Sequence, residues 1–150
     1  MTVIHRPAAA TGSPGIGPAI NGAFAPRSDI PHRIQRTRRR FNFTPPGAVY
    51  VGRPTLWSNP FSGRARIGHK RSVILYRAWV TGSLDPSTLL RIGVFSEAEV
   101  FALRRWRDRL IAALPQLRGR NLQCWCPLTS DWCHAETLLR LANPRLGVTP

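Results

Sequence analysis

The chain has 150 residues, enough for one domain, and its 22 lysines and arginines against seven acidic residues give a net charge of +15. No segment approaches the about 18 consecutive apolar residues of a membrane span, and the N-terminus lacks the apolar core of a signal peptide. Three cysteines are an odd number, which argues against a disulfide framework. We therefore expect a cytoplasmic protein with reduced thiols and no membrane partner.

The charge favours polyanionic partners such as nucleotides or nucleic acid. Only Lys70 is a lysine, so nearly all of the positive charge is arginine. A GC-rich genome enriches proteins in arginine without any such function. Both explanations of the charge stay open.

Residues 1–46 are predicted to form a disordered, basic N-terminal arm. This segment holds half of the fourteen prolines and shows no apolar period, so it cannot bury enough surface to offset its ordering entropy. Its last part, Arg36–Phe43, combines arginines with two phenylalanines. That run either clamps nucleic acid by phosphate contacts and stacking, or is a solvated charge run. The foldable domain is then residues 47–146.

The first half of this domain is predicted to contain one strand and one clear helix. Ala48–Val51 is β-branched and aromatic, as a buried strand is. Ser72–Val80 has helical periodicity, and Gly82 ends it. Residues 83–92 are ambiguous and allow a short turn of helix.

A longer helix is expected to begin at Ser96, because Ser96 and Glu99 have the spacing of a capping box. Pro115 closes it. Its apolar stripe consists of Val100, Leu103, Leu110, Ile111 and Leu114.

A second strand is predicted over residues 121–126 and a last helix over residues 133–141. Ser130 or Asp131 is a candidate cap for that helix, Leu138 and Leu139 are its buried residues, and Asn143-Pro144 ends it. The order strand, helix, helix, strand, helix predicts an α/β class: a small, layered, parallel-sheet domain. The loops that follow two parallel strands emerge at one sheet edge, so we expect residues 53–61 to lie beside the cysteines.

The loop of residues 53–61 carries polar and aromatic groups suited to a ligand. Arg53 offers a guanidinium fork for phosphate, Trp57 a stacking surface, and Asn59 a donor and acceptor pair, with Thr55 beside them. Packing explains the same residues equally well, with Trp57 and Phe61 in the core and Asn59 in a turn.

All three cysteines fall within eleven residues, together with one histidine: Cys124, Cys126, Cys133 and His134. On a strand, Cys124 and Cys126 point to one face and Trp125 to the other. Cys133 and His134 stand at a helix start, where the dipole stabilises a thiolate or an anion.

Three interpretations of this cluster remain open. The first is a zinc site, although Cys-X-Cys and adjacent Cys-His are poor ligand spacings. The second is a pocket in which Cys133 or His134 acts on a substrate. The third is a structural group of buried side chains.

Three sequence blocks, in order, resemble the domain-of-unknown-function family 4326 (DUF4326), which is found in phages and bacteria. They are Tyr50 to Phe61, Tyr76-Arg77-X-Trp79, and Leu122-X-Cys124-Trp125-Cys126 followed by Cys133-His134. The resemblance covers about residues 48–142. It implies no established activity. The family's recurring residues would here be Arg53, Pro54, Trp57, Asn59, Pro60, Phe61, Cys124, Cys126, Cys133 and His134.

Together these patterns predict a pocket for a nucleotide or a nucleic-acid element at the sheet edge. Arg53 would bind phosphate, Trp57 would stack and Asn59 would orient the ligand. Cys133 and His134 would supply the catalytic or anion-holding end, with Thr55, Cys124 and Cys126 among the binding residues. The alternative is a non-catalytic module, zinc-stapled or simply cysteine-rich, that binds nucleic acid through its arginines; its metal ligands would be Cys124, Cys126, Cys133 and His134. The sequence leaves the reaction and the oligomeric state open.

Overall fold

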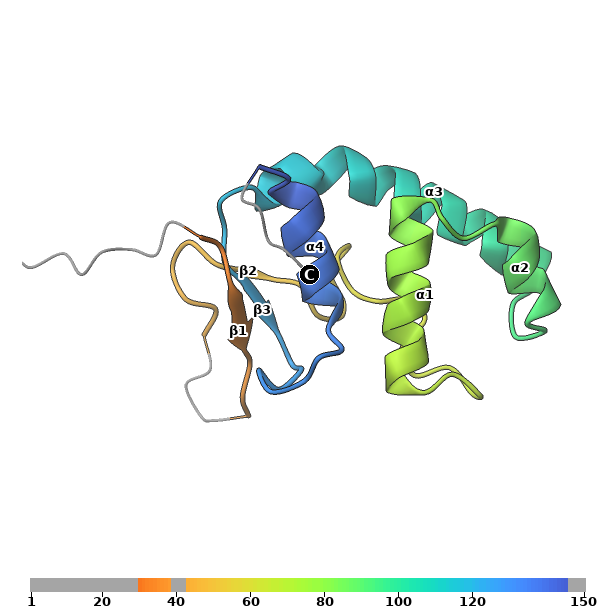
Figure 1. The fold of residues 1–150 in the computed structure, drawn as a ribbon, viewed down its shortest axis with the longest axis horizontal. Coiled ribbons are helices and arrows are strands. Elements are labelled where there is room, and N and C mark those ends of the chain that lie inside the picture. The colour runs from red at the N-terminus through yellow and green to blue at the C-terminus, as the bar shows by residue number, and fades with distance from the viewer. Residues whose placement is uncertain (1–29, 39–42, 146–150) are drawn as a thin grey trace, which may run out of the picture.

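A three-stranded parallel sheet lies at one end of the computed structural model, which describes residues 30–38 and 43–145 (Figure 1). Its strands are β1 (Arg33–Gln35), β2 (Val49–Tyr50) and β3 (Leu122–Cys124), in the order β1-β3-β2. Both outer strands run parallel to β3, which is buried along its whole length. The predicted parallel pairing of the two strands is confirmed, but β3 ends at Cys124, two residues before the predicted end.

The expectation that residues 1–46 form a disordered arm is wrong where the structure describes this segment, because β1 lies within it. Residues 33–35 are ordered as a strand because they pair with β3, the central strand of the sheet. The side chain of Gln123 on β3 is buried, and its Oε1 accepts hydrogen bonds from Arg36 Nη1 (3.1 Å) and Thr44 Oγ1 (2.9 Å). The domain therefore begins before residue 47. Residues 39–42 of the predicted arginine and phenylalanine clamp, and residues 1–29, lie outside the described ranges.

Two helices follow the loop after β2. The first, α1 (His69–Thr81), ends at Gly82, which adopts a left-handed conformation (φ 80°) and donates its N–H to the carbonyl of Trp79. This confirms the predicted stop. The second, α2 (Pro86–Arg91), is a short helix in the ambiguous segment, and Asp85 caps its N-terminus. The predicted element order therefore lacks β1, whereas α2 lies in the segment where the sequence allows a short turn of helix.

The long helix α3 (Glu97–Ala113) starts with the capping box that the sequence predicts. Ser96 Oγ accepts from the N–H of Glu99, and the Glu99 carboxylate accepts from the N–H of Ser96. The predicted apolar stripe is confirmed for those of its residues that are buried. The prediction is wrong for Ile111, because 40% of its surface is exposed. A short 3-10 helix, η1 (Leu114–Leu117), follows.

The last helix, α4 (His134–Ala142), buries Leu138 and Leu139 as predicted. Neither Ser130 nor Asp131 caps it. Cys133 is the N-cap residue, and its side chain makes no capping hydrogen bond. The Ser130 hydroxyl instead contacts the backbone of Trp132, because the loop turns before the helix begins.

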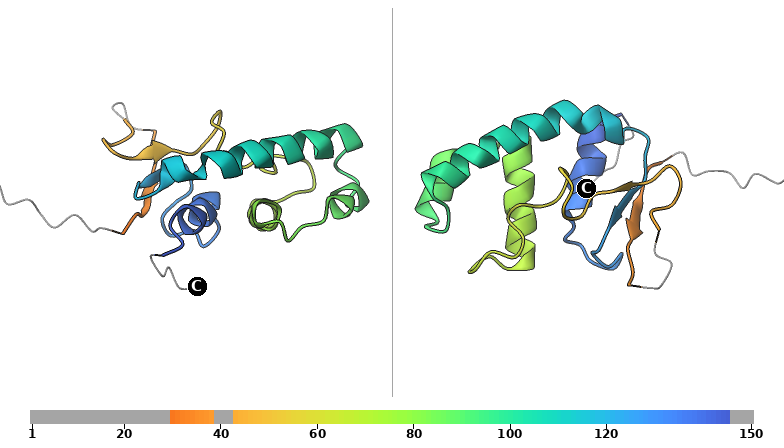
Figure 2. Two further views of the ribbon diagram at one scale, coloured as in Figure 1. Left: turned by 90° about the horizontal axis from the view of Figure 1, so that it is seen from above. Right: turned by 180° about the vertical axis from the view of Figure 1, so that it is seen from behind.

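The helices pack beside the sheet, and α3 runs across the molecule from α2 to the sheet end (Figure 2). α4 contacts β3, η1 and α1. The core joins Leu122 of β3 to Tyr76 of α1, Leu110 of α3 and Leu138 of α4, all of which are fully buried. In the described part of the chain no helix has both the length and the apolar character needed to cross a membrane.

Candidate functional site

The carboxyl ends of β2 and β3 meet, as the parallel topology requires. Just past β2, the N–H of Val51 donates to the carbonyl of Gln123 (2.9 Å). Nearby, Trp125 Nε1 donates to the hydroxyl of Tyr50 (2.7 Å), and this hydroxyl donates to the carbonyl of Arg53 (3.0 Å). The loop that carries Arg53 therefore lies beside the loop that carries the cysteines.

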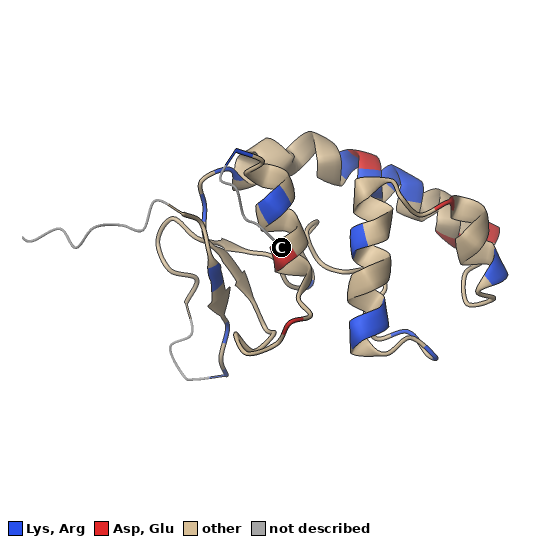
Figure 3. Cartoon of the chain, viewed as in Figure 1, with Lys and Arg blue, Asp and Glu red and all other residues tan. Residues whose placement is uncertain are grey.

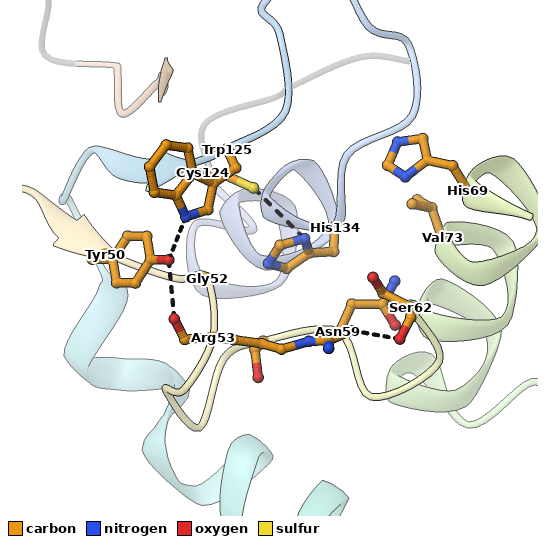
Figure 4. A pocket seen from close by; sticks show the side chains of 11 residues that line it. Tyr50, Gly52, Arg53, Asn59, Ser62, His69, Val73, Cys124, Trp125 and His134 are labelled. Atoms are coloured by element: carbon orange, nitrogen blue, oxygen red, sulfur yellow. Dashed lines mark hydrogen bonds between the residues drawn. The ribbon is translucent and has the colours of Figure 1, made fainter. Parts of the chain in front are cut away.

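A cleft of about 210 Å³ opens between these loops and α1 (Figure 4). Tyr50 and Trp125 stand on one side of it, His69 and Val73 on the other, with His134 between them and Arg53 along the lower edge. The lining residues come from three separate parts of the chain: Tyr50, Gly52, Arg53, Ser58, Asn59, Ser62, His69, Val73, Cys124, Trp125 and His134.

Arg53 lies where the sequence predicts it, at the cleft, and its guanidinium donates to the carbonyl of Ser62. Gly63, with φ at 76°, leaves room for this side chain, since a Cβ there would come within 3.3 Å of Arg53 Nη2. The peptide bond from Arg53 to Pro54 is cis. The loop therefore holds a guanidinium at the mouth of the cleft.

The other predicted binding residues of this loop serve the fold. Trp57 is 7% exposed and packs in the core, so the prediction that it offers a stacking surface is wrong and the packing alternative holds. Thr55 Oγ1 donates to the carbonyl of Gly52 within the turn. Asn59 is buried: it lines the cleft, but its amide donates to the Ser72 carbonyl (3.2 Å) and accepts from the N–H of Phe61 (2.9 Å).

The four residues Cys124, Cys126, Cys133 and His134, here called the thiol–imidazole cluster, come together at the end of β3. The sulfurs of Cys124 and Cys126 are 3.6 Å apart, and Cys124 Sγ lies 3.9 Å from His134 Nδ1. A ligand atom from each of Cys124, Cys133 and His134 lies within 4.8 Å of the others. On sequence grounds alone, Cys-X-Cys and adjacent Cys-His are poor spacings for metal ligands. This expectation fails because the chain bends after Cys124 and enters a helix between Cys133 and His134.

The thiols of the cluster are free. Hydrogen bonding from Cys124 and Cys126 lowers the pKa of the Cys133 thiol, and a hydrogen bond from Arg33 lowers it further. The same contacts, together with burial, raise the pKa of Cys124.

His134 is held as a neutral imidazole. Burial lowers its pKa, and Nε2 donates to the carbonyl of Val51 (2.9 Å), which leaves the lone pair of Nδ1 facing Cys124. Cys133 is only 1% exposed, so a molecule in the cleft meets Cys124 and His134 rather than Cys133. This burial disfavours the predicted role of Cys133 as a nucleophile.

Arg33 is the residue of this region that the sequence analysis missed. Its side chain is 8% exposed; Nε pairs with Glu136 Oε1 (2.9 Å) and Nη2 donates to the carbonyl of Leu128 (2.9 Å). Burial lowers the pKa of Arg33, but its interactions with Cys133 and Glu136 raise it above the usual value. No local signal marks Arg33, because only the pairing of β1 with β3 carries it to the cluster.

Three cleft residues were also missed. Tyr50 and Trp125 were assigned to strands without a role, and His69 precedes the predicted helix. His69 Nε2 donates to the carbonyl of Trp132 (2.8 Å), which ties α1 to the loop before α4. The alternation of Cys124, Trp125 and Cys126 was the available signal for Trp125, since on a strand it would point this ring to the face opposite the cysteines.

The comparisons with known proteins agree with the resemblance seen in the sequence. The sequence model of the family described as "Domain of unknown function (DUF4326)" matches residues 34–144. No curated protein and no solved structure matches the chain. The match begins in β1 and ends just after α4, so it spans the sheet, the cleft and the thiol–imidazole cluster. The chain therefore belongs to the DUF4326 family.

Proposed function

We propose that the cleft binds a phosphate-bearing ligand of the nucleotide class, either free or as the end of a nucleic acid. The observation that carries the proposal is the composition of the cleft: the cationic side chain of Arg53, the imidazole of His69 and the indole of Trp125 line one opening. Guanidinium groups bind phosphate in a two-pronged geometry, and exposed indole rings stack on bases.

Trp125 replaces Trp57 as the stacking residue in this proposal. Trp125 is 45% exposed, whereas Trp57 is 7% exposed. The guanidinium of Arg36 lies 5.5 Å from its ring centroid, and its Nε1 is bonded to Tyr50. The ring is therefore fixed in orientation, which lowers the entropy cost of stacking a base on it.

The surroundings of the cleft favour an anion. α1 begins beside the cleft with His69, Lys70 and Arg71, and its first turn contains no acidic residue. Positive side chains at the positive end of a helix dipole destabilise that end unless an anion compensates them. Basic residues also lie on β1 and α1, which carry no acidic residue, while α3 and α4 carry both kinds (Figure 3). An approaching polyanion is attracted by this field.

The proposal concerns binding and assigns no reaction. Both imidazole nitrogens of His134 face protein groups, and Cys133 is buried, so neither is placed to attack a ligand in the cleft. The volume of about 210 Å³ accommodates a phosphate with part of a nucleoside, and the remainder would extend over Trp125.

Calorimetric titration with inorganic phosphate, AMP and a 5′-phosphorylated dinucleotide tests this proposal. Arg53→Gln is expected to weaken AMP binding at least about tenfold, since a charge-assisted hydrogen bond contributes about 1.5–3 kcal/mol. Trp125→Leu should weaken AMP and leave inorganic phosphate nearly unaffected. Arg109→Gln, on the exposed surface of α3, is the matched control with the same change of charge.

Equal losses in Arg53→Gln and Arg109→Gln would indicate non-specific charge attraction and would contradict the proposal. So would AMP binding that is unchanged in both Arg53→Gln and Trp125→Leu.

A further inference from the structure

The thiol–imidazole cluster has the geometry of a metal centre, and we propose that it binds one zinc ion in a closed tetrahedral site. The ligands would be the sulfurs of Cys124, Cys126 and Cys133 and Nδ1 of His134. This inference goes beyond the anion cleft and does not depend on it.

Two distances between the donor atoms match those of a zinc tetrahedron. Zinc binds thiolate sulfur at about 2.3 Å and imidazole nitrogen at about 2.0–2.1 Å, so neighbouring ligand atoms in a tetrahedron are about 3.6–3.8 Å apart. The Cys124 and Cys126 sulfurs are 3.6 Å apart, and Cys124 Sγ is 3.9 Å from His134 Nδ1. Cys133 Sγ lies within 4.8 Å of Cys124 Sγ and of a ring nitrogen of His134. A disulfide would instead hold two sulfurs at about 2.05 Å.

The imidazole of His134 is oriented as a zinc ligand requires. A histidine that binds zinc through one nitrogen commonly donates the N–H of the other to a carbonyl or carboxylate, which fixes its tautomer. His134 does this through Nε2, which lies 2.9 Å from the carbonyl of Val51. Nδ1 is thereby the free lone pair, and it is the nitrogen that faces Cys124.

Arg33 supplies the charge that such a centre needs. Zn²⁺ with three thiolates and a neutral imidazole carries a net charge of −1, which is costly to bury unless a cation lies nearby. Arg33 Nη1 is buried and has no hydrogen-bond partner within residues 30–38 and 43–145, although the other nitrogens of this guanidinium are paired. The interaction between Arg33 and Cys133 places this charge beside the thiolates.

The ion would cross-link several parts of the fold. Its ligands come from the end of β3, the following bend and the start of α4, while Val51 and Arg33 bring in β2 and β1. With four protein ligands the centre has no open position for a substrate, as in structural rather than catalytic zinc sites. Cys124 and His134 also line the cleft, so the ion would stiffen one wall of it.

Metal analysis of the full chain, purified in reductant and without chelator, tests the proposal first. We expect one zinc ion per chain. Replacement by Co²⁺ should give the visible d–d bands of a tetrahedral complex and a sulfur-to-cobalt charge-transfer band for three thiolates. Cys126→Ser should weaken that charge-transfer band. Thr129→Ala, on the exposed part of the same loop, should leave both unchanged. The wild-type cobalt spectrum counts the thiolates even where a cysteine variant fails to fold.

A second measurement concerns Arg33. Arg33→Met is expected to lower zinc affinity by about 10–100-fold in competition with a chromophoric chelator, and Arg33→Lys should recover part of the loss. Folded chain that neither contains nor takes up zinc would overturn the proposal, as would a Cys124–Cys126 disulfide in the reduced preparation. A cobalt spectrum that is identical in Cys126→Ser would overturn the closed site. Unchanged zinc affinity in Arg33→Met would show that Arg33 does not support the metal site.

Discussion

Arg33 of β1 and Glu136 of α4 form a salt bridge in which Nε and Oε1 are 2.9 Å apart. The side chain of Arg33 is 8% exposed and that of Glu136 is 32% exposed. The same guanidinium donates to the carbonyls of Leu128 and Ser130, in the loop that leads to α4. One side chain from the start of the domain therefore anchors its last loop and helix.

Glu136→Ala is expected to lower the free energy of unfolding by about 3 kcal/mol, because it leaves the buried charge of Arg33 without its counter-ion. Urea unfolding followed by circular dichroism measures this, in samples of equal metal content. Arg140→Ala, on the exposed face of the same helix, is the control and should change stability by less than about 0.5 kcal/mol. Similar losses in both variants would mean that the ion pair contributes nothing specific.

Gly52 makes room for the ring of Tyr50. A Cβ at Gly52 would lie 2.6 Å from Tyr50 Cζ, so a methyl group there must displace the ring and its hydrogen bonds to Trp125 and Arg53. Gly52→Ala should cost about 1–3 kcal/mol of stability, as overpacking does. In a Tyr50→Ala background the same change should cost less than about 0.5 kcal/mol. A double-mutant cycle by chemical denaturation measures this coupling, and an equal cost in both backgrounds would contradict it.

Asn59 is expected to stabilise the loop rather than to select a ligand. Its buried amide bonds Phe61 and Ser72, so Asn59→Ala should destabilise the protein by about 1–3 kcal/mol. Asn59→Asp should cost more, because a carboxylate cannot donate to the Ser72 carbonyl and its charge would be buried. Thermal unfolding compares these variants with Ser58→Ala, in which only a hydroxyl bonded to the Thr55 carbonyl is lost. An Asn59→Ala protein as stable as wild type would contradict the structural role of Asn59 and would favour a role in ligand binding.

The parts of the fold that the sequence predicts are those encoded by neighbouring residues. The capping box of Ser96 and Glu99, the stop at Gly82 and the parallel pairing of β2 with β3 all follow from local spacing and element order. The clustering of three cysteines and a histidine located the candidate metal site for the same reason, since all four residues lie in one short segment.

The errors concern residues whose role depends on distant partners. β1 has three residues in a segment without an apolar period, and its hydrogen bonds with β3 define it. Trp57 and Trp125 are equally aromatic in the sequence, yet Trp57 is buried in the core while Trp125 is 45% exposed. The local sequence pattern could not distinguish these two rings, because the exposure of Trp57 depends on how α1 packs against the loop of residues 53–61.

The capping box also predicts a pH dependence of stability. Hydrogen bonds from the Ser96 N–H, from Arg64 and from the Ser96 hydroxyl lower the pKa of Glu99 from its usual 4.5 to about 2. A pKa that is lower in the folded state means that the carboxylate stabilises the fold fully above pH 4.5 and that this contribution is lost as the pH falls toward 2. Wild type should therefore have a higher melting temperature than Glu99→Gln near neutral pH, and the difference should close between pH 4.5 and 2.

Calorimetric melting curves from pH 2 to pH 7 measure this difference. Glu97→Gln removes a carboxylate from the same helical turn without touching the capping box, and its difference from wild type should be smaller throughout. Ser96→Ala removes the other half of the box and should cost about 1 kcal/mol at neutral pH, the usual contribution of a serine N-cap. A Glu99→Gln difference that stays constant across this pH range would show that the capping hydrogen bonds do not depend on the charge of Glu99, and the stabilisation would then belong to the serine alone.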